Sequence, residues 1–326
     1  MTCSRFRTWV YWSIGLLFTF NSVNTCADWP LNVITALSQE DPMYQGLLRF
    51  KQEVEKRTNK EVNVRIFYGS QLGSDTDILE QARAGANVAV LVDAGRLSVY
   101  TNPLGILGAP FLVNGLGQAR QLVTSPLFAQ WEADLKHSAQ LQILSFNWWQ
   151  GQRHLLTQKP ISVPADLNGV RLRTIGAPVF IETIRAMGAT PTPMSWTEVY
   201  PALQQRVIDG AEAQHQATYN ARLYEVIPHI TKTAHINLMT GLVASAKWFQ
   251  DLPKPYQEIV RQAALSAGDY ASQLTQDSQK EYEEKMQAAG TQIHEIDVTD
   301  FKTATRSVYS LLGYEELKKQ VDNILE

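Results

Sequence analysis

Residues 88–93, with the sequence Val88-Ala89-Val90-Leu91-Val92-Asp93, decide the fold class. This unbroken apolar run, closed by one acidic residue, is typical of a parallel strand that is buried on both faces. Upstream, Val62–Tyr68 alternates apolar and polar residues, which predicts a second strand. Between the strands, Ser74 and Asp77 form a capping-box pattern that begins a helix, and Gly85 ends that helix.

The same alternation extends toward the N-terminus. Leu31–Leu37 is predicted to be a strand, and Pro42–Arg57 carries apolar residues at helical spacing. Together these segments give the order strand, helix, strand, helix, strand, which indicates an open α/β sheet. Ligands of such sheets bind beyond the carboxyl ends of the strands, and Asp93 stands at one of these ends.

A second α/β unit is predicted over residues 151–235. Val170–Arg173 is a short strand, and Pro178 occupies the favoured first turn of the helix that follows it. Ser195 and Glu198 form a second capping-box pattern at the start of another helix. The chain therefore contains two α/β units in succession, which indicates two lobes.

A long helical pattern covers residues 255–289 and predicts one helix or two consecutive helices, and a final helix is predicted at Leu311–Leu325. Thirty-five helical residues span about 52 Å. This length exceeds the diameter of a lobe made of half the chain, so the helix either kinks or lies across both lobes.

The two cysteines, Cys3 and Cys26, both lie in a segment that is typical of a secretory signal peptide. Arg5 and Arg7 precede the mostly apolar stretch Trp9–Phe20, and small residues end the segment. Cleavage after residue 27 leaves 299 of the 326 residues, with no cysteine for a disulfide, a nucleophile or a metal site. A lipid anchor on Cys26 is an alternative.

The charge balance argues against a nucleic-acid partner. The 29 basic residues include the two arginines of the leader, which leaves 27 against 32 acidic residues in the mature chain. A nucleic-acid-binding protein needs a basic surface. No apolar run after the leader approaches the about 20 residues of a membrane span, so we expect no membrane insertion of the mature chain.

The motifs of common enzyme classes are missing from the sequence. It has no HExxH, GxSxG or Walker A pattern, and Asn114-Gly115-Leu116-Gly117 lacks the third glycine of a dinucleotide fingerprint. The histidines show no metal-ligand spacing. We therefore expect no catalytic residues, no cofactor and no metal site, with a periplasmic enzyme as the disfavoured alternative.

Arginines at strand ends are the candidate ligand contacts. Arg173 closes the strand Val170–Arg173, and Arg153 begins the strand-like segment that continues to Thr157. The planar guanidinium group of arginine grips a carboxylate through two parallel hydrogen bonds. An arginine at a strand end is by itself most often a surface charge.

The chain closely resembles the solute-binding proteins of TRAP transporters, of the dicarboxylate-binding (DctP) type. Ordered matches to that family run through the mature chain. They include Gly69–Asp75, Ala109–Leu112, Pro164–Arg173, Ala186–Met194 and Ile208–Glu212. The resemblance implies a two-lobed periplasmic-binding-protein fold with a central cleft, several hinge crossings and a long helix across both lobes. It also implies the division into lobe I, residues 28–150 and about 239–278, and lobe II, residues 151–238 and about 279–326.

The resemblance also implies roles for single residues. Arg173 takes the position that forms the main bidentate salt bridge with the substrate carboxylate, and Arg153 takes that of an assisting arginine. Trp196 is expected to wall the pocket, Asp93 to contact substrate hydroxyls, and Tyr44 to lie where the first strand–helix loop meets the ligand.

Four further positions are candidate ligand contacts. Trp149 and Gln152 border the crossing between the lobes and are expected to line the cleft. Many family members carry an asparagine that holds the carboxylate at the position of Ala213, and Gln214 or His215 are the candidates to replace it.

The resemblance therefore implies an extracytoplasmic, monomeric binding protein that captures a small organic acid and delivers it to a TRAP permease. We expect a sugar acid or a related hydroxy or oxo acid, because an acidic residue and tryptophans flank the arginines. A C4-dicarboxylate, an aromatic acid, or delivery of the ligand to a sensor remain alternatives.

Overall fold

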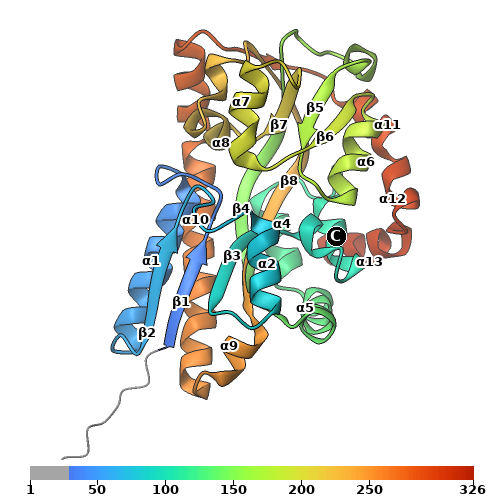
Figure 1. Cartoon of the computed structure of the whole chain (residues 1–326). Helices are drawn as coiled ribbons and strands as arrows, with labels where there is room; N and C mark the ends of the chain where they lie inside the picture. The colour runs from blue at the N-terminus through green and yellow to red at the C-terminus, as the bar shows by residue number, and fades with distance from the viewer. Residues whose placement is uncertain (1–28) are drawn as a thin grey trace, which may run out of the picture.

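A single nine-stranded mixed sheet runs through the computed structural model, which describes residues 29–326. The strand order is β2-β1-β3-β8-β4-β7-β5-β6, with β9 paired to β8. We call the end that holds β1–β3 lobe I and the end that holds β5–β7 lobe II (Figure 1). The predicted leader, residues 1–27, lies outside the described residues.

Lobe I contains the β-α-β-α-β unit that the sequence predicts. Its parallel strands are β1 (Trp29–Ile34), β2 (Val62–Phe67) and β3 (Val88–Asp93), connected by α1 (Pro42–Arg57) and α2 (Asp75–Arg83). All six residues of β3 are buried, because side chains of successive residues enter separate cores on the two faces of the sheet. The predicted fold class is therefore confirmed.

Lobe II holds the second, smaller α/β unit. The parallel strands β5 (Arg171–Thr174), β6 (Thr190–Pro193) and β7 (Gly210–Ala213) lie side by side, with α6 (Pro178–Ala186) between β5 and β6 in sequence. Buried apolar side chains again form two clusters, one on each face of the sheet. The short 3₁₀ helix η3 (Trp196–Glu198) follows β6.

Two antiparallel strands of 17 residues each connect the lobes, β4 (Leu141–Thr157) and β8 (His229–Ser245). The sequence predicted only a short strand after Arg153, whereas Arg153 lies inside β4. The pairing of β4 with β8 shifts register several times between Ile143 and Leu155, which marks bulges at the crossing. Gly151 stands there with a φ of +97°, a conformation that favours glycine.

The 35-residue helix α10 (Lys254–Ala288) is the third connection, and it extends along both lobes (Figure 1). It packs on α1 and β4 in lobe I and on α8 (His215–Asn220) and β9 (Gln292–Glu295) in lobe II. The expectation that one long helix spans both lobes is confirmed. The remaining helices are short: α3 (Ala94–Leu97), η1 (Asn102–Gly108), α4 (Leu116–Val123), α5 (Pro126–Ala139), η2 (Pro164–Leu167), α7 (Val199–Gln204), η4 (Leu223–Glu225), α9 (Ala246–Asp251), α11 (Thr299–Thr305), α12 (Ser307–Leu311) and α13 (Glu315–Leu325).

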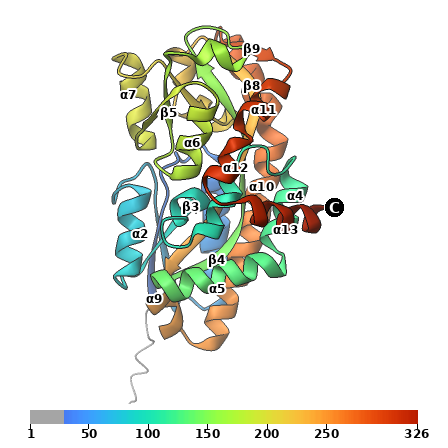
Figure 2. The ribbon, with the colours of Figure 1, turned by 90° about the vertical axis from the view of Figure 1, so that its right-hand side faces the viewer.

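The C-terminal helix departs from the predicted division into lobes. The prediction assigned residues 279–326 to lobe II, and α11 and α12 do pack there, against α6. The last helix, α13, instead packs on α4 and η1 of lobe I (Figure 2). Its apolar face, which includes the fully buried Val321, joins the main core of lobe I. Burial of this face places α13 on lobe I, although the helices before it in the sequence pack on lobe II.

Helix α6 of lobe II also packs on lobe I. Phe180 is fully buried and belongs to the lobe I core. It fills a notch beside Gly95 and Gly108, and a Cβ atom on Gly95 would lie 2.4 Å from the Cε2 atom of Phe180. The two lobes therefore share an apolar contact in this arrangement.

We expect the substitution Phe180→Ala to lower the free energy of unfolding by about 3–5 kcal/mol, because it leaves a cavity between the lobes. Chemical denaturation followed by circular dichroism measures this change. Leu311→Ala is the matched control, because Leu311 is 65% exposed and its loss should change the stability by less than about 0.5 kcal/mol. Equal stability of the two variants would contradict the packing role of Phe180.

Candidate ligand-binding site

The carboxyl ends of parallel strands from both lobes meet at a cavity between the lobes. Lobe I contributes the residues after β1, the end of β3 and the start of α2 and α3. Lobe II contributes the end of β5, the turn η3 and the residues after β7, while β4 and β8 form the floor. The polar and aromatic side chains that line it are Thr35, Asp75, Asp93, Arg96, Gln150, Arg153, Arg173, Trp196, Gln214 and Thr240.

Arg173 is a buried cation without an acidic partner. Its side chain is 1% exposed, and Nε and Nη2 donate hydrogen bonds to the backbone oxygen of Met194 at 3.2 and 2.9 Å. The guanidinium carbon lies 5.3 Å from the centre of the Trp196 ring. No carboxylate of residues 29–326 forms a salt bridge with it. Burial, reinforced by the charge of Arg153, lowers the pKa of Arg173 to about 9.

Arg153 is held by the protein itself. Its Nε forms a salt bridge with the carboxylate of Glu212, its Nη2 donates to the backbone oxygen of Glu212, and its Nη1 donates to Gln214 Oε1 at 3.2 Å. Thr174 Oγ1 donates to the other carboxylate oxygen of Glu212 at 2.8 Å. Burial raises the pKa of Glu212, but Arg153 and the hydrogen bonds from Arg153 and His235 lower it more, to about 2.

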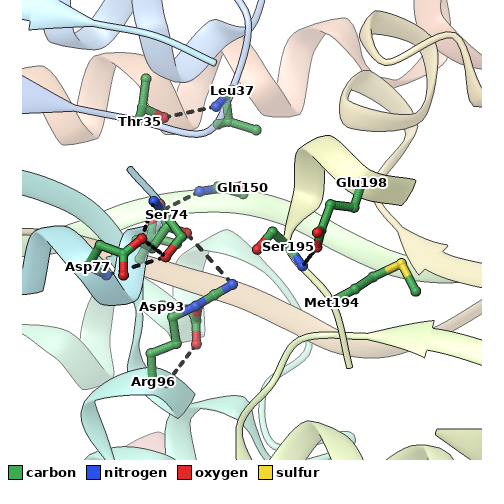
Figure 3. Close-up of polar contacts among 12 residues, drawn as sticks. Thr35, Leu37, Ser74, Asp77, Asp93, Arg96, Gln150, Met194, Ser195 and Glu198 are labelled. Carbon is green, nitrogen blue, oxygen red and sulfur yellow. Dashed lines mark hydrogen bonds and ion pairs between the residues drawn. The ribbon is translucent and has the colours of Figure 1, made fainter. Parts of the chain in front are cut away.

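A second charged group lies on the lobe I side of the cavity (Figure 3). Asp93 caps α3 by accepting a hydrogen bond from the backbone nitrogen of Arg96 at 2.9 Å, and its second oxygen pairs with the Arg96 guanidinium. Arg96 Nη2 also lies 3.7 Å from Asp75 Oδ2. Burial raises the pKa of Asp75, and the charge of Arg96 only partly offsets this effect.

Arg96 and Asp75 line the cavity although the sequence analysis did not select them. Both positions follow from local capping. Arg96 lies three residues after Asp93, so the cap of α3 turns its side chain back toward the same strand end. Asp75 directly follows the capping residue Ser74 of α2, whose first turn faces the cavity.

Four of the nine predicted site residues lie outside the cavity lining, and two of them are on β4. The indole of Trp149 is buried in the lobe I core and donates to Asn237 Oδ1 at 3.1 Å, and Gln152 pairs in register with Asn237. Trp149 and Gln152 do not line the cavity because the bulge around Gly151 changes the alternation of side chains along β4. Gln150 and Arg153, three positions apart, consequently both face the cavity.

His215 and Tyr44 are the other two predicted site residues that lie outside the cavity lining. The His215 ring packs 4.6 Å from the ring of His154, and its Nε2 lies 3.1 Å from Glu283 Oε1 on α10. His215 therefore connects α8 to α10, whereas Gln214 faces the cavity. Tyr44 packs edge-on against Tyr68, with ring centres 5.9 Å apart, and does not reach the cavity.

A cleft between two lobes that buries an arginine with no salt bridge to a carboxylate of residues 29–326 is suited to binding a small anionic solute. The model of the bacterial extracellular solute-binding proteins of family 7 (DctP) matches residues 33–316. The chain belongs to this family. Within residues 29–326, no helix is long and apolar enough to cross a membrane, and no group of three or more acidic, histidine or cysteine side chains is placed to hold a metal ion.

Solved structures and a curated protein extend the comparison. A TRAP periplasmic solute-binding protein from Escherichia fergusonii, in an apo open form, is 46% identical with a TM-score of 0.80, over 90% of this chain and 99% of that one. One from Ochrobacterium anthropi with bound L-fuconate is 31% identical with a TM-score of 0.88, over 92% and 100%. The 2,3-diketo-L-gulonate-binding periplasmic protein YiaO of Escherichia coli K12 is 26% identical over 78% of each chain.

We expect Glu212→Gln to destabilise the protein by about 3–5 kcal/mol at pH 7, because Arg153 then remains buried without a counter-charge. The pKa of Glu212 is lower in the folded protein, about 2, than its ordinary value of 4.5. The stabilisation by its carboxylate is therefore complete above about pH 4.5 and is lost as the pH falls toward 2.

Thermal unfolding of the wild type and of Glu212→Gln from pH 7 to pH 3 measures this effect, and the gap between the two should narrow toward acid. Glu316→Gln is the matched control, because Glu316 is 72% exposed and pairs only with Lys319 at the surface. A Glu212→Gln protein as stable as the wild type at pH 7 would contradict this role of the ion pair.

Proposed function

We propose that this protein binds a sugar acid through the Arg173 guanidinium in the periplasm, as a monomer, and delivers it to a TRAP permease. The observation that carries the proposal is the burial of Arg173 in the cleft without an acidic partner. An ion pair formed there is screened less than one at the surface, so a ligand carboxylate gains more from the contact. No bond needs to be made or broken.

The relatives support a hydroxylated acid. L-Fuconate and 2,3-diketo-L-gulonate, which two of them are described as binding, each combine a carboxylate with several oxygen groups. The cavity of this chain offers matching partners, since Thr35, Gln150 and Thr240 surround the arginines. Hydroxyl groups of a ligand can both donate to and accept from such side chains.

The charge arrangement favours a single carboxylate. Arg153 is neutralised by Glu212, and Arg96 lies between Asp93 and Asp75. Among the arginines that line the cavity, Arg173 is the one without a salt bridge to a carboxylate, so one ligand carboxylate has one guanidinium group to pair with. A second carboxylate would have to lie near the acidic side chains of lobe I, where it would be repelled.

The arrangement of the lobes supports a clamp that closes on its ligand. This structure superposes better on the L-fuconate complex than on the apo open relative, although the open relative shares more of its sequence. Two proteins with similar lobes superpose less well over the whole chain when the angle between their lobes differs. Bending of the β4, β8 and α10 crossings would carry the motion.

We expect Arg173→Ala to weaken binding of the sugar acid by about 2–5 kcal/mol, which is a factor of about 30 to several thousand. Arg171→Ala is the matched control. It removes an arginine two positions away on the same strand, whose side chain is 47% exposed and pairs with Asp209 at 2.8 Å.

Isothermal titration with an organic-acid library, after a thermal-shift screen, makes the measurement. Circular dichroism of both variants checks that the fold is intact. Undiminished binding to the Arg173→Ala protein, or stabilisation by neutral sugars and by no acid, would refute the proposal.

We also expect a preference for one carboxylate over two. In matched pairs such as D-galacturonate with galactarate and D-glucuronate with glucarate, the diacid should bind at least about tenfold more weakly, because Arg173 is the one arginine of the cavity lining without a salt bridge to a carboxylate. Competition titration compares the members of each pair under the same salt. Equal or tighter binding of the diacids would contradict the charge balance described for the cleft.

A further inference from the structure

Trp196 lines both the Arg173 cavity and a second, larger cavity beside it. We call the second cavity the aromatic chamber and define it by its side chains Ser38, Asp41, Tyr68, Trp196 and Tyr200. Its volume is larger than that of the cavity around Arg173. The space around the arginine is thus the smaller part of the cleft.

The two cavities are adjacent. They share Ala36 and Leu37 of lobe I and Trp196 and Ala217 of lobe II as lining residues. The chamber therefore lies directly beside the Arg173 cavity, with the Trp196 ring at the boundary between the two spaces. Trp196 contacts both spaces, with one part of its surface near the Arg173 guanidinium, 5.3 Å from its ring centre.

The chamber has the chemistry of a ring-binding site. Three aromatic side chains line it, and two are held in place by neighbours. Tyr44 supports Tyr68 edge-on at 5.9 Å between ring centres, and the Tyr200 hydroxyl donates to Glu225 Oε2 at 2.8 Å. Ligand sites in proteins are lined mainly by apolar and aromatic side chains with a few polar groups that fix orientation.

Two polar groups are available in the chamber. The Ser38 hydroxyl is buried and has no hydrogen-bond partner among the described residues. Asp41 is 1% exposed, and one of its oxygens accepts from the backbone nitrogen of Met43 at 2.9 Å. Burial raises the pKa of Asp41 to about 7, against the lowering effect of that hydrogen bond. A buried hydroxyl without a partner is costly, and a ligand hydroxyl would satisfy it.

Both lobes build the chamber. Ser38, Asp41 and Tyr68 come from lobe I, whereas Trp196 and Tyr200 come from lobe II. The aromatic walls therefore face each other only when the lobes are close together. A ring held between them contributes to closure together with the carboxylate at Arg173.

We propose that the aromatic chamber is a second subsite, which binds a second ring of the ligand beyond Trp196. The inference rests on the proposed function, because the carboxylate of the same ligand occupies Arg173. The ligand class is then a uronic acid that carries a sugar or aryl ring through its glycosidic bond, because the carboxylate on C5 and the glycosidic bond on C1 leave the sugar ring at different carbons, on either side of the ring oxygen. A free uronate fills only the inner cavity.

The experiment compares each free uronate with its phenyl β-glycoside by isothermal titration, for D-glucuronate and for D-galacturonate. We expect the glycoside to bind about tenfold more tightly in at least one pair, as a buried aromatic contact provides. The substitution Tyr200→Ala should remove most of this gain, measured as the ratio of the two dissociation constants. The corresponding disaccharide acid serves as the sugar-ring arm of the test.

Tyr270→Ala is the matched control, because Tyr270 lies on α10, is 37% exposed and lines neither cavity. It should keep the wild-type ratio. Equal binding of uronate and glycoside, exclusion of the glycosides, or an unchanged ratio in Tyr200→Ala would each overturn the inference. In those cases, binding of the free uronate that depends on Arg173 would still support the proposed function, whereas loss of all acid binding would refute both.

Discussion

The ion pair between Arg153 and Glu212 is the interaction on which the rest of the site depends. Both side chains are buried, and each would be costly without the other. The carboxylate of Glu212 is paired with Arg153 and accepts a hydrogen bond from Thr174. Glu212 therefore forms no salt bridge with Arg173, although both residues lie in lobe II. Arg173 is left to a backbone oxygen and an aromatic ring, and an anionic ligand is what balances its charge.

The crossing strands place the binding residues at the same point as the hinge. Gln150 and Arg153 lie on β4, and Thr240 lies on β8, where the pairing of these strands changes register. Side chains at this point face the cavity whichever lobe moves, since the strands belong to both lobes. The site is therefore preorganised at its floor and completed at its walls by closure.

Local patterns in the sequence predicted those parts of the fold that local interactions determine. The helix Pro42–Arg57 has the predicted bounds, the capping box at Ser74 is present, and the long helix differs from its prediction by one residue at each end. The two long strands were missed because β4 carries polar residues in its middle and a bulge at Gly151, which together remove the alternating pattern. Contacts such as that of α13 with lobe I depend on tertiary packing that periodicity does not encode.

The apolar contact at Phe180 determines the spacing of the charged groups in the cleft. Phe180 follows β5 by one short turn, and its ring packs against Gly95. This contact positions the end of β5, and with it Arg173, relative to lobe I. Gly95 is the residue before Arg96, so the same contact also borders the lobe I charges. Packing of this kind is insensitive to salt, whereas the attraction between Arg173 and an approaching anion is screened while the cleft is open. The geometry of the closed state is thus set by packing, and its population is set by the ligand.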